Sequence, residues 1–110
     1  MAEPHDSKRV NSLFRFRTRD LTPAQREEYS STLEHMRSLA SAMPGFISFR
    51  RYTSDDGEML AVTEFASAEA LAAWRDHPDH SKAQQRGRNQ FYSEYEIIKC
   101  TVIHRYGYKH

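Results

Sequence analysis

The sequence alternates between stretches in which hydrophobic residues recur at every second position and stretches in which they recur at every third or fourth. The stretch from Val10 to Thr18 is of the first kind, because Phe14 and Phe16 alternate with Arg15 and Arg17. This alternation is typical of a strand that buries one face. We therefore predict a first strand over residues 10–18.

Three further strands are predicted. Residues 46–53 and 58–65 carry alternating apolar residues, and the Asp-Gly pair within Ser54–Gly57 favours a turn with positive φ between them. These two strands should therefore form a hairpin. Residues 91–106 are rich in β-branched and aromatic residues, which predicts the last and longest strand. The apolar register of this strand shifts at Ile97-Ile98, which indicates a bulge.

A long helix is predicted between the first two strands. Thr22, Pro23 and Gln25 supply an N-cap, a first-turn proline and a capping-box residue. The helix should run to about Ala42 and end at Pro44-Gly45. Its apolar stripe recurs at spacings of three and four and consists of Tyr29, Leu33, Met36, Ala40 and Met43.

A second helical region follows the hairpin. Ser67 is placed to cap a helix through His77, Pro78 stops or turns it, and a third short helix reaches about Gln90. The order β-α-β-β-α(α)-β predicts an α+β fold of the ferredoxin-like split β-α-β type, a four-stranded antiparallel sheet with its helices on one face. We expect residues 10–110 to form one domain and the polar residues 1–9 a disordered N-terminal tail.

Both faces of this sheet should carry large apolar residues. The opposing sets are Ile47 and Phe49 against Phe46 and Tyr52 in the second strand, Met59 and Phe65 against Leu60 and Val62 in the third, and Ile98, Cys100 and Val102 against Tyr95, Ile97 and Ile103 in the last. The helices cover one face only, and an uncovered apolar face invites aggregation. The simplest cover is the same face of a second copy, so we predict a homodimer through the open sheet face.

Composition narrows the function classes. Sixteen basic residues balance 15 acidic ones for a net charge of +1. The chain therefore lacks the excess of positive charge that is typical of proteins that bind nucleic acid or an anionic membrane. No apolar run approaches the length of a membrane span, and the N-terminal residues lack an apolar signal core. A single cysteine, Cys100, rules out an internal disulfide and fits a reducing compartment. We expect a cytoplasmic protein.

The residues resemble the antibiotic biosynthesis monooxygenase (ABM) domain family, within the dimeric α+β-barrel group. The resemblance spans Val10 to Tyr106 and lies in the order and spacing of five motifs: Pro44–Ser48, Asp56-Gly57, Val62–Phe65, Ser67–Trp74 and His77–His80. It implies a homodimer with a pocket in each subunit between the sheet and its helices. Some members oxidise polycyclic phenols with oxygen and no metal or flavin, and others bind or degrade haem.

The chain departs from both of these patterns. Phenol-oxidising relatives use an asparagine shortly before the end of the third strand, where this chain has Ala61, Val62 or Thr63. Haem-degrading relatives pair the helix tryptophan with a histidine about ten residues later. Trp74 is present here, but Gln84 stands near the histidine position.

Six residues are the candidates for chemistry. His77 and His80 are predicted as acid–base residues, because imidazole titrates near neutral pH, and Trp74, Phe65, Tyr52 and Arg50 as substrate-binding residues. Five of them have a structural alternative: Trp74 as a core aromatic, Arg50 with Tyr52 as edge or interface residues, and the two histidines in structural or solvent roles, with His77 as the cap of the third helix. No third metal ligand accompanies the histidines, so we predict no metal site. The resemblance to the phenol-oxidising members implies that no other cofactor is needed.

These observations favour cofactor-independent oxidation of a small aromatic or quinol-type substrate. The protein would deprotonate the substrate, which would then reduce oxygen itself. Two alternatives remain open. One is a non-catalytic binder of a small aromatic metabolite or haem, and the other is a structural dimer module whose pocket is filled by its own side chains.

Overall fold

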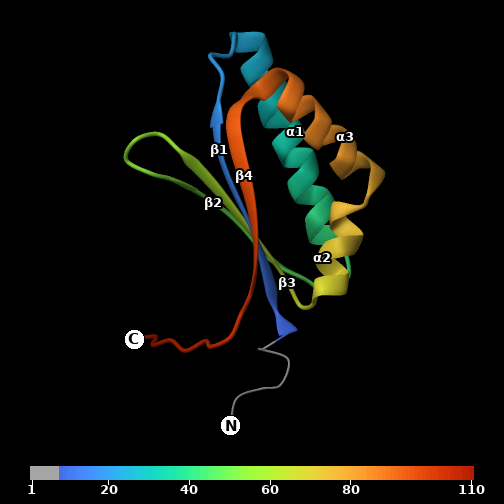
Figure 1. The fold of residues 1–110 in the computed structure, drawn as a ribbon, viewed down its shortest axis with the longest axis vertical. Helices are drawn as coiled ribbons and strands as arrows, with labels where there is room; N and C mark the ends of the chain where they lie inside the picture. The colour runs from blue at the N-terminus through green and yellow to red at the C-terminus, as the bar shows by residue number, and fades with distance from the viewer. Residues whose placement is uncertain (1–7) are drawn as a thin grey trace.

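The computed structural model describes residues 8–110, so residues 1–7 of the predicted tail lie outside the described residues. The elements are β1 (Val10–Thr18), α1 (Pro23–Ala42), β2 (Phe46–Thr53), β3 (Met59–Phe65), α2 (Ala68–Arg75), α3 (Pro78–Arg86), a π-helical turn η2 (Gly87–Phe91) and β4 (Tyr92–Thr101). Their order is the predicted one, and the α+β ferredoxin-like fold is confirmed (Figure 1).

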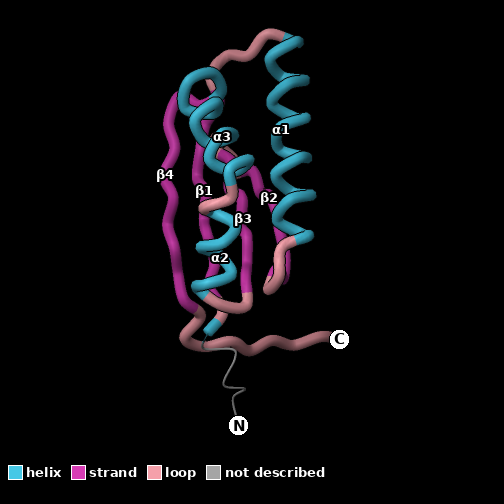
Figure 2. The backbone as a smooth tube through the Cα atoms, turned by 90° about the vertical axis from the view of Figure 1, so that its right-hand side faces the viewer, coloured by secondary structure: helices cyan, strands magenta, loops and turns pink. Residues whose placement is uncertain are grey.

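The strands form one antiparallel sheet in the order β2-β3-β1-β4. All three α-helices lie on the same face of this sheet, with α2 and α3 in front of the strands in Figure 2. In the described part of the chain, no helix covers the opposite face (Figure 1). The sheet thus has a helix-covered face and an open face, and these two names are kept below.

Local signals in the sequence form as expected. The backbone N–H of Gln25 donates to Thr22 Oγ1 at 3.2 Å and the N–H of Thr22 donates to Gln25 Oε1 at 2.9 Å, so the capping box starts α1. Gly57 takes φ +90° in the β2–β3 turn. Gly45 takes φ +85°, and a Cβ there would lie 2.7 Å from the Cβ of Ala70. Only glycine meets both demands at position 45, which lets α2 pack closely on this turn.

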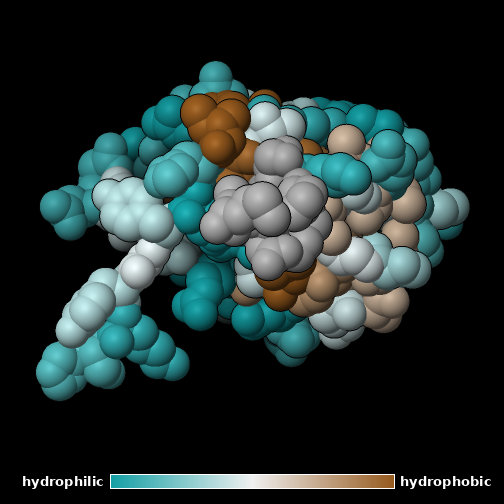
Figure 3. Space-filling model, turned by 90° about the horizontal axis from the view of Figure 1, so that it is seen from below, coloured by the Kyte–Doolittle hydropathy of each residue, from teal (hydrophilic) through white to brown (hydrophobic). Residues whose placement is uncertain are grey.

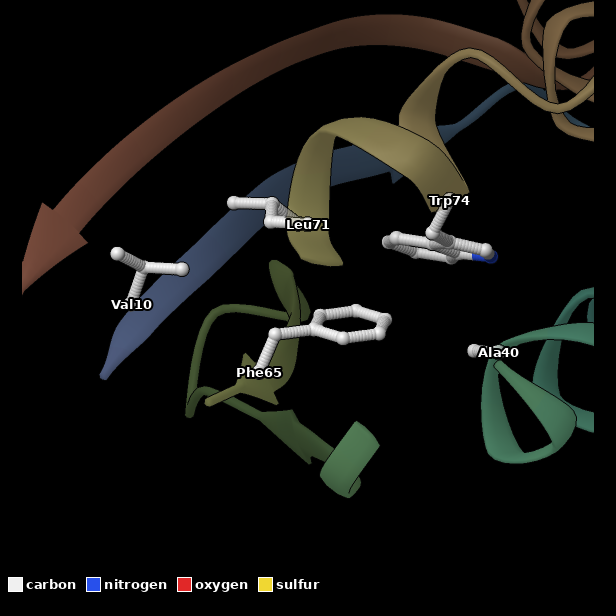
Figure 4. Close-up of a cluster of buried hydrophobic side chains, with 5 residues drawn as sticks. All are labelled: Val10, Ala40, Phe65, Leu71 and Trp74. Carbon is white, nitrogen blue, oxygen red and sulfur yellow. The ribbon is translucent and has the colours of Figure 1, made fainter. Parts of the chain in front are cut away.

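The hydrophobic core lies between the sheet and α1 and α2. Its buried members are Val10, Ala40, Phe65, Leu71 and Trp74. Figure 4 shows the Phe65 ring lying below the Trp74 indole, with Leu71 of α2 to one side and Ala40 of α1 to the other. Phe65 is fully buried and also meets Phe46 edge-on, at 5.9 Å between ring centroids.

The last strand is shorter than predicted. It ends at Thr101 instead of Tyr106 because its pairing partner β1 begins at Val10, which faces Thr101. One more hydrogen bond, from the N–H of Val102 to the carbonyl of Arg9 at 2.9 Å, extends the pairing. Beyond it, the C-terminal segment leaves the body of the molecule on the side away from the helices (Figure 1).

The predicted bulge at Ile97-Ile98 is wrong. Both residues pair regularly with β1, and the β1–β4 register shifts between Arg17 and Thr18 instead. A second irregularity lies in β2, between Phe46 and Ser48. It places both Phe46 and Phe49 toward the helices, since Phe46 packs on the core and Phe49 lines the cavity described below. The predicted opposition of these two side chains is therefore wrong as well.

Within residues 8–110, no helix combines the length and the hydrophobicity that crossing a membrane requires.

Candidate functional site

A cavity of about 520 Å³ lies between the helix-covered face and the helices. Its floor includes the small side chains of Ser12, Ala61 and Thr63 at the middle of the sheet. Helices α1, α2 and α3 supply walls that include Tyr29, Leu71, Trp74 and His80. A hollow of this volume and mainly apolar lining is of the size that holds small organic ligands.

The cavity exists because the bulky rings gather at its two ends. At one end, Trp74 packs on Phe65 at 5.7 Å between ring centroids. At the other end, the Tyr29 ring meets Phe16 at 6.4 Å and Phe91 at 5.4 Å between ring centroids. The small residues between these clusters leave space that no ring fills.

His80 is one of two predicted acid–base residues, and it lines the cavity. Its imidazole stacks on the Trp74 indole, with ring centroids 4.2 Å apart and planes 24° apart. Its Nδ1 lies 3.2 Å from the carbonyl oxygen of Arg75. A carbonyl only accepts, so Nδ1 must carry the proton, and the neutral ring keeps its lone pair on Nε2.

Burial lowers the pKa of His80, the nearby charges of His77 and Lys99 lower it a little further, and the hydrogen bond to Arg75 opposes both. The imidazole is therefore neutral at pH 7. A neutral ring whose tautomer leaves the lone pair on Nε2 can accept a proton from a bound ligand.

Two polar atoms of the cavity wall lack partners. The indole Nε1 of Trp74 and the hydroxyl of Tyr29 are buried and make no hydrogen bond within residues 8–110. Burial raises the pKa of Tyr29 to about 12, so its hydroxyl keeps its proton at neutral pH. Buried donors are rarely left unsatisfied, because each costs free energy unless a partner or ligand meets it. Both donors therefore suit a ligand with oxygen acceptors.

Two contacts attach α3 to α1 and close the cavity on the helix side. His35 Nε2 of α1 lies 3.1 Å from Asp79 Oδ2 of α3. Arg86 at the other end of α3 pairs with Glu28 of α1. The helix that carries His80 is thus held at both of its ends.

His77, the other predicted acid–base residue, has a structural role. It is the N-cap of α3, and its Nδ1 accepts from the backbone N–H of Asp79 at 3.1 Å. The alternative stated above for His77 is confirmed, and this side chain is not part of the cavity wall.

The four predicted substrate-binding residues separate into three places. Trp74 lines the cavity, and Phe65 lies behind it in the core. Arg50 and Tyr52 lie on the open face, around a shallow hollow that also contains Glu64. The structure therefore brings Trp74 together with His80 and sets Arg50 and Tyr52 on the other side of the sheet. Whether any of the six takes part in binding or catalysis stays a prediction.

Two wall residues were missed by sequence reasoning. Tyr29 was assigned to the apolar stripe of α1, and the stripe gives no sign that its hydroxyl lacks a partner. Lys99 of β4 also lines the cavity. Its place in the sequence indicates only that it lies on the same face of the strand as Ile97. In the described residues, no group of three or more histidine, cysteine, aspartate or glutamate side chains is arranged to hold a metal ion.

The fold and the site define an α+β protein with a ligand-sized hollow between its sheet and its helices. The model of the antibiotic biosynthesis monooxygenase family matches residues 14–86. The chain belongs to this family.

A curated relative is "uncharacterized protein YqjZ" of Bacillus subtilis. It is 35% identical over 74 residues, which cover 67% of this chain and 65% of the relative. The match thus spans just under two thirds of the relative's length.

Several solved structures share the fold. A variant of SnoaB, a cofactor-independent oxygenase from Streptomyces nogalater, aligns with a TM-score of 0.73 at 17% identity, over 89% of this chain and 96% of its own. Rv0793 from Mycobacterium tuberculosis aligns with a TM-score of 0.74 at 21% identity, over 90% of this chain and 99% of its own. A dimeric ferredoxin-like protein of unknown function from Thermobifida fusca gives 0.68 at 19% identity, over 87% and 92%. At these identities the likeness concerns the fold alone.

Three of the four positions named above for the departures from the two patterns line this cavity, and the fourth, Val62, lies on the open face. Ala61 and Thr63 belong to its floor, and Gln84 belongs to its wall together with Trp74. Any chemistry at this site therefore depends on a residue set that differs from both patterns named above.

Proposed function

We propose that this protein is a cofactor-independent oxygenase that oxidises a small aromatic or quinol-type substrate in the cavity between its sheet and helices. The observation that carries the proposal is His80: a neutral imidazole with Nδ1 bonded to a carbonyl, stacked on an indole and lining a ligand-sized hollow. The family membership supports the same reaction class.

In the proposed reaction, His80 Nε2 accepts the phenolic proton of the substrate. The resulting phenolate is a far better electron donor than the phenol, and it reduces oxygen without help from a cofactor. For a quinol with a free ring C–H, the overall change is quinol plus O2 to hydroxyquinone plus water. One oxygen atom forms the new C–O bond, and the other leaves as water with two hydrogens from the substrate.

The two unpartnered donors fit this substrate class. The Nε1–H of Trp74 and the hydroxyl of Tyr29 come from opposite ends of the cavity. Each can donate to a phenolic or quinone oxygen, while the apolar side chains between them accept the ring.

Oxygen uptake with a panel of benzene- and naphthalene-1,4-diols tests the proposal. His80→Gln removes the base while keeping a side chain of similar size, and we expect it to lower the turnover rate by about a hundredfold or more. The matched control is His77→Asn, since asparagine also caps helices well and residue 77 is outside the cavity wall. Full turnover in His80→Gln would exclude His80 as the base.

We further propose that two copies associate through their open faces. Leu13 of β1 faces Val62 of β3 and Ile98 of β4, and these three half-buried side chains form an apolar band across the sheet. Ion pairs flank the band on its hairpin side, where Arg15 meets Glu58 and Arg17 meets Asp56. An apolar centre with a charged rim is typical of a protein interface.

A further inference from the structure

The cavity wall contains a lysine whose charge no carboxylate of the wall itself balances. Lys99 lies on the edge strand β4, directly opposite Ser12 of β1, and its side chain reaches the cavity. The residues that line this cavity include no aspartate or glutamate within the described part of the chain.

Lys99 differs from the other cations near the site. Arg75 also lines the cavity, but its Nε donates to Asp76 Oδ1 at 3.0 Å. Arg86 pairs with Glu28 across the helices. Among residues 8–110, no ion pair or side-chain hydrogen bond involves the ammonium group of Lys99.

Lys99 is exposed, so solvent screens part of its charge. A charge beside an apolar, partly closed hollow still acts more strongly than the same charge in water. The charge of Lys99 is felt at His80, whose pKa it helps to lower, and at Asp76, which already pairs with Arg75. A ligand that brings a negatively charged oxygen to this place gains an attraction that a neutral ligand of the same shape lacks.

We propose that the cavity selects aromatic compounds that carry an ionised oxygen, such as a carboxylate, with this oxygen at Lys99 and the ring beside Trp74. The inference rests on the proposed function, because it assumes that the cavity is the ligand site. It specifies in addition that the ligand is negatively charged, a property that the oxidation of a quinol does not require.

Two ligands of similar shape test whether a negative charge on the ligand increases its affinity. They are 1-naphthoate, which is anionic at pH 7, and the neutral 1-naphthalenemethanol. Calorimetry measures the dissociation constant of each. The indole N–H signal of Trp74, the only tryptophan in the chain, locates the binding by NMR.

We expect 1-naphthoate to bind roughly two- to fivefold more tightly than the alcohol, the range of an exposed charge pair. Lys99→Met should remove this preference and leave the binding of the alcohol unchanged, and Lys99→Arg should restore it. Lys82→Met is the matched control, because Lys82 of α3 is exposed and does not line the cavity.

The inference is overturned if both probes bind equally well, or if Lys99→Met weakens both by the same factor. In these cases the proposed function stands, since an aromatic ligand still occupies the cavity. If neither probe shifts the Trp74 signal, the cavity does not bind such aromatics, and the proposed function is overturned together with this inference.

Discussion

The two faces of the sheet are built from the same four strands, yet they bury their side chains differently. On the helix-covered face, Phe16 and Phe65 are exposed by 1% and 0%. On the open face, Leu13, Leu60 and Val62 are all half-buried. The difference follows from the cover: helices pack on the first face, and within the described chain no helix covers the second (Figure 1). The C-terminal segment reaches the second face only at its margin, where Arg105 donates to Glu64.

The comparison teaches that apolar residues of one sheet can serve two purposes. The covered face has enough aromatic bulk at its ends to form a core, and its small middle residues leave a cavity. The open face has an apolar band at its centre, and the shallow hollow beside it is lined mainly by polar residues. Seen from below, hydrophobic residues gather in patches within a mainly hydrophilic surface (Figure 3). We interpret the covered face as the ligand site and the open face as the interface.

The largest expected effect is a difference in unfolding free energy between a variant of the helix-covered face and a variant of the open face. Phe65→Ala removes a fully buried ring that packs on both Phe46 and Trp74. It should lower the free energy of unfolding by about 3–5 kcal/mol. Leu60→Ala on the open face should cost less than half as much when urea unfolding is measured at low protein concentration, where a dimer contributes little. Equal losses for the two variants would contradict the difference in burial.

The next prediction concerns assembly. Leu13→Glu places a carboxylate at the centre of the apolar band, between Val62 and Ile98. Burying this charge in an interface is costly, so the variant should sediment as a monomer at micromolar concentration while the wild type sediments as a dimer. Lys82→Glu on α3 is the control and should remain dimeric. A wild-type protein that sediments as a stable monomer would refute the interface.

A smaller effect is expected from filling the cavity. Ala61 is buried in the cavity floor, and Ala61→Leu adds volume toward the hollow. We expect the affinity for 1,4-naphthalenediol to fall by about tenfold or more, with a change in unfolding free energy of about 1 kcal/mol or less, because the added atoms enter existing space. Calorimetry and urea unfolding give the two values. Undiminished affinity would mean that the ligand binds elsewhere.

The smallest effect is a dependence on pH. Because the pKa of His80 is lowered below 6.5 in the folded protein, the unfolded state binds more protons as the pH falls below this value. The contribution of neutral His80 to the free energy of unfolding is therefore fully present above about pH 6.5. It is lost as the pH falls through the lower pKa that His80 has in the folded protein.

Urea unfolding of the wild type and of His80→Gln between pH 7.5 and 5 measures this dependence. The wild type should lose more stability than the variant over that interval. Identical pH profiles would show that His80 is not buried as described.

Local signals predicted much of the fold. The Thr22–Gln25 capping box, the Asp56-Gly57 turn and the cap at Ser67 all act between neighbours in the chain, so a short window of sequence contains them. The end of β4 at Thr101 is different, because it depends on where β1 begins some 90 residues earlier.

The site was predicted only in part for the same reason. His80 and Trp74 were both candidates, but their stacking depends on how the chain turns at Pro78 between two helices. Two features of the site depend on what distant segments supply: the hydroxyl of Tyr29 has no hydrogen-bond partner within residues 8–110, and no acidic side chain lines the cavity beside Lys99. No local pattern encodes such an absence.

A crystal structure with 1,4-naphthalenediol, soaked without oxygen, tests the central interpretation most directly. We expect the rings to lie in the cavity beside Trp74, with one hydroxyl within hydrogen-bond distance of His80 Nε2. A diol bound only at the open face, near Arg50 and Tyr52, would contradict the account, as would a cavity closed by its own side chains.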